Sequence, residues 1–180
     1  MPTKRCLVFG GFGAIGSAVA REFEKNSFEV WRTSRSWRAN EPKSLVAVGD
    51  GIADGESFNS LPQFDAVVWA QGSNLNDSIV EYKADEFDEV LNANVKFVAS
   101  TLSSLLIQNK ILPGVIDTPM TRGVLTEKQV LSVGERTSFG RLVRPEELAN
   151  VIFFLCSDLN SCITGQSIVA DLGFANVRPI

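Results

Sequence analysis

The stretch Phe9-Gly10-Gly11-Phe12-Gly13-Ala14-Ile15-Gly16 decides the fold of this chain. It follows an apolar run, Cys6 to Phe9, and leads into a helical pattern, which predicts a strand, a glycine turn and the start of a helix. Gly11, Gly13 and Gly16 fit G-x-G-x-x-G, a pattern in which backbone N–H groups can approach a pyrophosphate at the positive end of the helix. On its own the match leaves a plain strand-to-helix turn as an equal alternative.

Length and composition indicate an ordinary globular protein. The chain has 180 residues, of which 44% are hydrophobic and 21% charged, enough for one domain with its own core. We therefore predict a single domain over residues 1–180. The net charge of −4 and the lack of a basic run argue against nucleic acid as a partner. No apolar run predicts a membrane span, and the glycines near the N-terminus favour a nucleotide loop over a signal peptide.

The cysteine and histidine counts narrow the chemistry. Cys6, Cys156 and Cys162 are odd in number and lack C-x-x-C spacing, which argues against a disulfide framework and against a zinc site. We expect packed thiols in a reducing compartment and hence a cytoplasmic protein. Histidine is absent, which removes histidine metal sites and histidine-based triads. We therefore predict no metal site.

The first half of the chain alternates strands and helices. Apolar residues recur at helical spacing from Ala14 to Lys25, and Phe28 to Thr33 predicts the second strand of a β-α-β unit. Ser44 to Gly49 and Asp65 to Ala70 predict two further strands. This order is typical of an α/β protein with a Rossmann-like doubly wound parallel sheet, whose ligands bind beyond the carboxyl ends of the strands.

The end of the second predicted strand bears on the choice of cofactor. NAD-binding chains carry an acid about 20 residues after the glycines, where it binds the ribose 2′-OH. Thr33-Ser34-Arg35-Ser36 stands there instead, and hydroxyls with an arginine fork suit a 2′-phosphate that an acid would repel. We predict NADP(H) in preference to NAD(H), with Arg35 as the main contact and Ser34 and Arg38 as helpers. The alternative is that Arg35 is a solvated loop charge.

A long helical pattern runs from Lys83 to Gln108, and one of its faces is predicted to be buried. The apolar residues of that face are Phe87, Val90, Leu91, Val95, Val98, Leu102, Leu105 and Leu106. Asn94 lies on the same face. Because a buried amide must be hydrogen-bonded, Asn94 is either a satisfied core residue, which we favour from spacing alone, or part of a site.

The pattern breaks after this helix. Ile111 and Leu112 run straight into Pro113-Gly114, which leaves too little apolar sequence for a normal strand. A doubly wound sheet continues with a strand-helix-strand unit of roughly 30 residues or more. We infer that this block is missing between Lys110 and Pro113.

The last third of the chain predicts fewer elements. Thr121 to Gly140 lacks a strong period and suits a mobile flap over a ligand. Pro145-Glu146-Glu147 has the proline and acids that open a helix, and its buried stripe is predicted at Leu148, Val151, Ile152 and Leu155. Ser167 to Asp171 predicts a final strand.

With these pieces in order, the chain resembles the short-chain dehydrogenase/reductase family over essentially its whole length except at the gap. The glycine loop, Asp50, Trp69 to Gly72, Asn94 and Pro113 to Thr118 appear in the family's order. The most specific part is the tail, where the segments similar to the family's closing signature are Arg141 to Ala149, Phe154 to Asp158, and Ile163 to Gly173.

The resemblance assigns cofactor contacts to this chain residue by residue. The implied contacts are Gly10, Gly11, Gly13, Ala14, Ile15 and Gly16 at the pyrophosphate, Asp50 at the adenine, Ala70, Gln71 and Gly72 along the nucleotide wall, and Pro113, Gly114, Ile116 and Thr118 around the nicotinamide carboxamide. For Thr118 a plain turn or N-cap role is the alternative.

The resemblance also implies hydride transfer between nicotinamide and a small carbonyl or alcohol substrate. The family uses a serine and Tyr-x-x-x-Lys, but the one tyrosine here is Tyr82, and Glu86 stands four residues later. Asn94 is the one catalytic residue that carries over. Two alternatives stay open: a catalytic block absent from the given sequence, or a non-catalytic NADP(H)-binding or interaction protein. Family members form homodimers or homotetramers, to which Phe174 to Ile180 is apolar enough to contribute.

Overall fold

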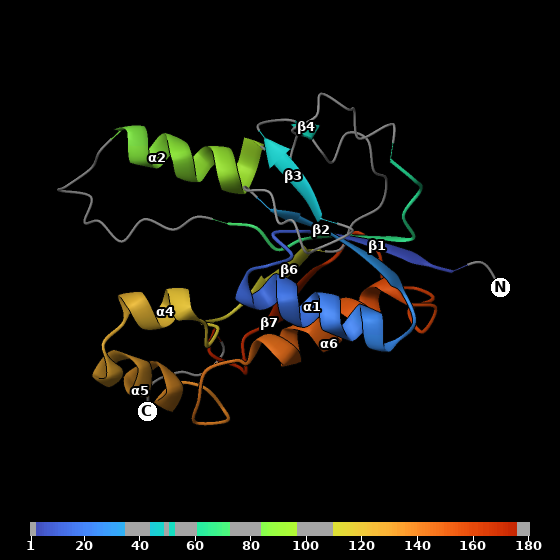
Figure 1. The fold of residues 1–180 in the computed structure, drawn as a ribbon. Coiled ribbons are helices and arrows are strands. Elements are labelled where there is room, and N and C mark those ends of the chain that lie inside the picture. Colours follow the sequence, from blue (N-terminus) through green and yellow to red (C-terminus); the bar gives the residue numbers. More distant parts are fainter. Residues whose placement is uncertain are drawn as a thin grey trace. The chain divides into compact units, whose positions relative to one another are not determined.

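The computed structural model describes residues 3–34, 44–48, 51–52, 61–72, 84–96 and 110–175 (Figure 1). The chain divides into two compact units, Met1–Leu106 and Ile107–Ile180, and each is described by itself. That both belong to one domain stays a prediction.

The first unit is built on a five-stranded sheet of order β4-β3-β2-β1-β5. β1 (Arg5–Phe9) pairs in parallel with β2 (Glu29–Ser34) on one side and with β5 (Ala66–Trp69) on the other. β3 (Ser44–Val48) runs parallel to β2, and the short β4 (Gly51–Ile52) is antiparallel to β3. Because the chain first builds outward from β1 to β3 and then returns to the other side of β1, the topological switch point lies between β1 and β5.

Helix α1 (Ala14–Lys25) has the bounds that the sequence predicts. Its positions Ala18, Val19 and Phe23 are buried, with 0–3% of their surface exposed, and the buried strand β1 supplies the other half of this core. Among the described residues, the largest fully buried side chains all lie on this helix and strand: Phe9, Phe23, Leu7, Val8, Val19 and Cys6. Full burial of a valine or phenylalanine side chain contributes about 1.5–3 kcal/mol. The helix and the strand hold the glycine turn between them.

Helix α2 (Ala84–Leu91) and the π-helical turn η3 (Asn92–Lys96) correct one prediction. The face expected to be buried is open, because Phe87 is 42% exposed and Val95 is 55% exposed. Among the described residues the sheet ends at β5, so no further strand offers this helix an apolar surface. The part of the predicted helix from residue 97 to 108 lies outside the described residues.

The second unit contains a two-stranded parallel sheet, in which β6 (Lys110–Pro113) pairs with β7 (Ser167–Ala170). The expectation that Ile111 and Leu112 were too few for a strand is wrong. The register matches Lys110 to Ser167 and Pro113 to Ala170, so a partner distant in sequence supplies the hydrogen bonds that the short apolar run could not predict.

Three helices complete the second unit: α4 (Pro119–Val124), α5 (Glu127–Glu135) and α6 (Pro145–Cys156). The first two correct the expectation of an irregular flap from Thr121 to Gly140. Their start signals are local, since Thr118 caps α4 and Thr126 forms a capping box with Gln129 at α5. Helix α6 begins at Pro145 as predicted, although of its apolar stripe only Leu148 is fully buried.

Candidate functional site

The glycine turn packs tightly against the start of α1. Gly10 adopts a positive φ of 70°, a conformation that favours glycine. A Cβ on Gly16 would lie 2.8 Å from the carbonyl carbon of Gly10 and 2.9 Å from the Cα of Gly11, and a Cβ on Gly11 would lie 2.7 Å from the Cβ of Arg32. Backbone replaces side chains here, as the sequence predicts for a loop that approaches an anion.

The N-terminus of α1 has no partner from a side chain. Gly13 is the N-cap residue, no side chain caps the helix, and the first turn contains no acid. The backbone N–H groups of Ala14, Ile15 and Gly16 therefore lie at the positive end of the helix dipole, where a phosphate can bind.

The end of β2 is tied to this loop through Thr33. The Thr33 side chain is buried, and its Oγ1 accepts a hydrogen bond of 3.1 Å from the backbone N–H of Gly10. Thr33 therefore positions the glycine turn. Ser34 is the last residue of β2 and is half-buried. The other contacts predicted nearby, Arg35, Arg38 and Asp50, lie outside the described residues.

Arg32 is a neighbour of the loop that the sequence reasoning missed. Its Nη2 donates to Glu24 Oε1 at 2.6 Å, and its guanidinium lies 5.7 Å from the ring centroid of Phe12. The sequence held a signal for the position of Arg32. Arg32 stands two residues after Val30, so the two side chains fall on the same face of the strand. Arg32 connects α1, β2 and the glycine turn.

The carboxyl end of β5 lies against the same turn. The N–H of Ala70 donates to the carbonyl of Phe9 at 2.9 Å, and a Cβ on Gly10 would lie 2.7 Å from the backbone nitrogen of Gln71. Both polar atoms of the Gln71 side-chain amide are buried, and neither has a hydrogen-bond partner in the structure described here. Buried amide atoms are ordinarily paired, so this one is unusual.

Asn94 approaches this end of β5 from η3. A Cβ on Gly72 would lie 3.1 Å from Asn94 Oδ1, so the two residues are neighbours. The Asn94 side chain is exposed, and its interpretation as a core residue on a buried face is therefore wrong. Its catalytic role stays a prediction.

The predicted contacts of the second unit lie on and after β6. Gly114 packs against Asp171, since a Cβ on Gly114 would lie 2.7 Å from that of Asp171. Ile116 is buried and forms a parallel bridge with Val143. Pro113 is the last residue of β6 and is exposed.

Thr118 acts as the N-cap of α4. Its Oγ1 accepts a hydrogen bond of 3.2 Å from the N–H of Thr121 and lies 3.1 Å from Thr121 Oγ1. This is the turn role that the sequence left open as an alternative. A contact with a cofactor stays a prediction.

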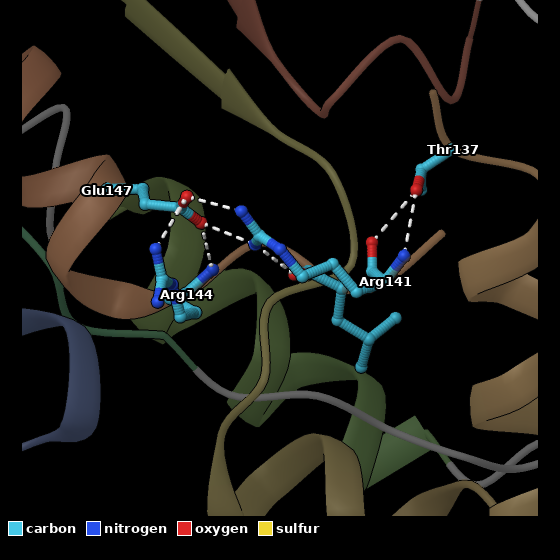
Figure 2. A network of polar contacts seen from close by, with 5 residues as sticks. Thr137, Arg141, Arg144 and Glu147 are labelled. Atoms are coloured by element: carbon cyan, nitrogen blue, oxygen red, sulfur yellow. Dashed lines mark hydrogen bonds and ion pairs between the residues drawn. The ribbon is translucent and has the colours of Figure 1, made fainter. Parts of the chain in front are cut away.

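A network of polar contacts fixes the turn between α5 and α6 (Figure 2). Arg141 donates from Nη1 and Nη2 to the two carboxylate oxygens of Glu147, at 2.8 and 2.7 Å, and Glu147 Oε2 also accepts from the N–H of Arg144. Thr137 Oγ1 lies 2.9 Å from the carbonyl oxygens of Gly134 and Arg141, and its hydrogen serves one of them at a time. Every member has a partner inside the network, so we interpret it as structural.

The cysteines and acids of the described ranges form no metal centre: no group of three potential ligands comes together in that part of the chain. Cys6 is buried, and burial raises the pKa of the Cys156 thiol to about 11. Cys162 is exposed, so the expectation of a packed thiol is wrong there. Among the helices that the structure describes, none has the length and apolar character needed to cross a bilayer.

Comparison with known proteins gives matches in sequence and in structure. Residues 90–175 match the family described as Enoyl-(Acyl carrier protein) reductase. The chain is 46% identical over 63 residues to the 3-oxoacyl-(acyl-carrier-protein) reductase FabG of Aquifex aeolicus, which covers 35% of this chain and 25% of that protein. The chain thus spans about a quarter of the length of this relative.

Two further matches span almost the whole chain. A tropinone reductase homolog of Arabidopsis thaliana is 24% identical over 242 aligned positions, covering 95% of this chain and 92% of that protein. The solved structure of ElxO with NADP bound superimposes with a TM-score of 0.78 at 19% identity, covering 96% of this chain and 99% of the other.

The fold and the glycine turn define a Rossmann-like doubly wound α/β protein. The motifs and matches go one step further: the chain resembles the short-chain dehydrogenase/reductase family, and the match to the family model covers residues 90–175. The alignment with the Arabidopsis protein is longer than this chain of 180 residues, which fits a block missing from the sequence.

Proposed function

We propose that this chain is the dinucleotide-binding part of an NADP(H)-dependent oxidoreductase that transfers a hydride between nicotinamide and a small carbonyl or alcohol substrate. The observation that carries the proposal is the start of α1, where Gly13 leaves the helix without a side-chain cap or an acid and Gly16 packs on Gly10. Backbone N–H groups at that turn would hold the pyrophosphate. The bound nicotinamide supplies the hydride chemistry.

The NADP(H) preference rests on the residues at the end of β2. Ser34 offers a hydroxyl there, and Arg35 follows it directly in the sequence. The stretch Thr33 to Ser36 contains no acid. Hydroxyl and guanidinium groups bind a phosphate better than they bind a bare ribose hydroxyl. The NADP in the ElxO structure and the reductase activity named for FabG support the same cofactor and a carbonyl substrate.

Catalysis requires residues that the sequence does not contain. We place the catalytic serine, tyrosine and lysine in a block that is absent from the sequence before β6, because Lys110–Pro113 form one continuous strand. We assign to Asn94 a supporting role beside Gly72. The second candidate, a non-catalytic NADP(H)-binding protein, is favoured by one observation: Tyr82 is the one tyrosine of the given sequence, and Glu86, not a lysine, stands four residues after it. Intact mass of the natural polypeptide separates the two, because 19.6 kDa would rule out the missing block and a mass several kDa higher would support it.

The proposal includes a cytoplasmic homodimer or homotetramer. Large apolar side chains of the second unit are exposed, with Phe154 at 40%, Leu159 at 75% and Val169 at 53%. A second copy of the chain would cover such surface. Sedimentation at micromolar concentration tests this part, and a monomer would contradict it.

Calorimetric titration of the purified chain with NADPH and with NADH tests the cofactor assignment. We expect NADPH to bind more tightly, and Arg35→Ala to abolish most of the difference. An unchanged preference in Arg35→Ala would contradict the assigned role of that residue. The 180-residue chain should bind NADPH without oxidising it in the presence of small carbonyl compounds, since the proton donor is missing. Turnover by this chain would contradict the missing-block proposal.

A further inference from the structure

We propose that the Gln71 side-chain amide is a positioning residue for the ribose on the nicotinamide side of the dinucleotide. The inference rests on the proposed function and gives the Gln71 side chain a specific ribose contact, which the assignment of Ala70, Gln71 and Gly72 to the nucleotide wall leaves unspecified. It starts from the amide itself, because its nitrogen and its oxygen are buried and, in the described structure, unpartnered.

The unpaired donor and acceptor of the amide favour the binding of a ligand that can hydrogen-bond with both. A buried donor and a buried acceptor without partners carry an unfavourable desolvation cost, which a ligand that pairs with both of them removes. No hydrogen bond has to break when the side chain rotates toward such a ligand. Gln71 as a whole is half-buried, so part of the residue already lies at the surface of the described structure.

The neighbours of Gln71 place it beside the proposed pyrophosphate loop. A Cβ on Gly10 would lie 2.7 Å from its backbone nitrogen and 2.8 Å from its Cα, so the two backbones are in direct contact. On its other side, Gly72 lies next to Asn94 Oδ1. Gln71 therefore stands between the glycine turn and the candidate catalytic asparagine.

The order of the strands in the sheet indicates which part of the dinucleotide lies near Gln71. The 2′ position of the adenosine ribose is read at the end of β2, where Ser34 stands, and the pyrophosphate sits at the turn after β1. β5 lies on the opposite side of β1 from β2. A dinucleotide that follows this edge of the sheet brings its second ribose to the end of β5.

Hydrogen-bond chemistry favours a ribose over the other groups within reach. A pyrophosphate only accepts, which would leave the carbonyl oxygen of Gln71 unpaired. Neighbouring ribose hydroxyls each donate and accept, so they can satisfy both ends of the amide. An adenine edge would also pair with both ends, but the strand order places adenine toward β2 and away from Gln71.

The test uses ADP and ADP-ribose, which differ by the second ribose alone, and the variant Gln71→Met, whose side chain has nearly the same size and shape. Calorimetric titration should show ADP bound equally by the wild type and the variant, and ADP-ribose bound about tenfold more weakly by the variant. Gln63→Met is the matched control, because Gln63 is exposed and precedes β5. It should change neither affinity.

Thermal unfolding without ligand gives the second readout. Replacing an unpaired buried amide with an apolar group should raise the unfolding midpoint of Gln71→Met by about 2 °C or more. A lower midpoint, or failure to fold, would show that the amide has a partner within the chain and would overturn the inference.

The outcomes separate this inference from the proposed function. If the wild type binds neither ADP nor NADPH, the proposed function fails and this inference fails with it. If the wild type binds ADP-ribose and Gln71→Met binds it equally well, the role of Gln71 alone is refuted. If the variant loses affinity for ADP to the same extent as for ADP-ribose, the contact is to the pyrophosphate and the ribose assignment is wrong.

Discussion

Arg141 and Glu147 form a two-bonded ion pair across the turn that leads into α6, with Nη1 2.8 Å from Oε2 and Nη2 2.7 Å from Oε1 (Figure 2). Oε2 also accepts a hydrogen bond of 2.9 Å from the backbone N–H of Arg144. These contacts, the one with Arg141 foremost, hold the pKa of Glu147 well below its usual range. One carboxylate therefore caps the helix and fastens the turn before it.

Variants at Glu147 should separate these two roles. Glu147→Gln keeps an oxygen for the N–H of Arg144 and loses the charge, whereas Glu147→Ala loses both contacts. We expect Glu147→Ala to lower the free energy of unfolding by about 0.5–2 kcal/mol more than Glu147→Gln does, the usual size of a helix-capping effect. Urea unfolding measures the difference. Glu146→Gln, at an exposed position of the same first turn, is the control, and equal effects of all three variants would refute the capping role.

The low pKa of Glu147 predicts how stability depends on pH. A carboxyl group whose pKa is lower in the folded state than its ordinary 4.5 stabilises the protein fully above that value and loses the contribution as the pH falls. Asp117 acts in the same direction, because its hydrogen bond with Arg122 lowers its pKa. The thermal midpoint of the wild type should therefore fall as the pH drops below about 4.5.

Glu147→Gln provides the check on this pH dependence. Because glutamine does not titrate, the variant should lose less stability than the wild type between pH 7 and pH 3. Thermal unfolding followed by circular dichroism gives both profiles. Parallel profiles would mean that Glu147 does not contribute to the acid sensitivity of the fold.

The first unit was largely predictable because its signals are local. Helix α1 combines a strong helical period with a glycine start, and its predicted bounds are confirmed. The strands β1, β2, β3 and β5 follow apolar runs that end at turn residues, and each differs from its prediction by a residue or two at most. Strand β6 was not predicted, because its four residues form a strand by pairing with β7, which lies at the other end of the second unit.

The site could be predicted where the backbone conformation restricts the type of residue. It could not be predicted where the role of a residue depends on contacts with residues distant in sequence. Gly10 and Gly16 could be recognised from spacing, since positive φ and close packing restrict those positions to glycine. The hydrogen bond from Gly10 to Thr33 and the buried amide of Gln71 depend on which strands meet. Asn94 was misplaced because helical spacing shows which face is apolar, not whether another element covers it.

Gly16→Ala should destabilise the fold and weaken dinucleotide binding. The added Cβ would lie 2.8 Å from the carbonyl carbon of Gly10, so either the turn or the helix start must move. We expect a loss of about 1–3 kcal/mol in the free energy of unfolding, as for other overpacked sites. Gly123→Ala is the matched control, because a Cβ there meets nothing within 4 Å and alanine favours helix α4 by about 0.5–1 kcal/mol. A Gly16→Ala variant as stable as the control would disprove the packing argument.

Ser34→Asp should reverse the cofactor preference. Ser34 ends β2 next to Thr33, whose hydroxyl holds the glycine turn, so an acid at position 34 would stand where NAD-binding chains carry theirs. At contact distance a carboxylate repels a 2′-phosphate by about 1–4 kcal/mol, so NADPH affinity should fall about tenfold or more while NADH binding is kept or improved. Ser34→Asn, similar in size but uncharged, controls for crowding and should keep the preference for NADPH. Calorimetric titration of both variants with both cofactors decides the matter, because an equal loss in Ser34→Asn would assign the effect to sterics and remove the electrostatic basis of the NADP(H) preference.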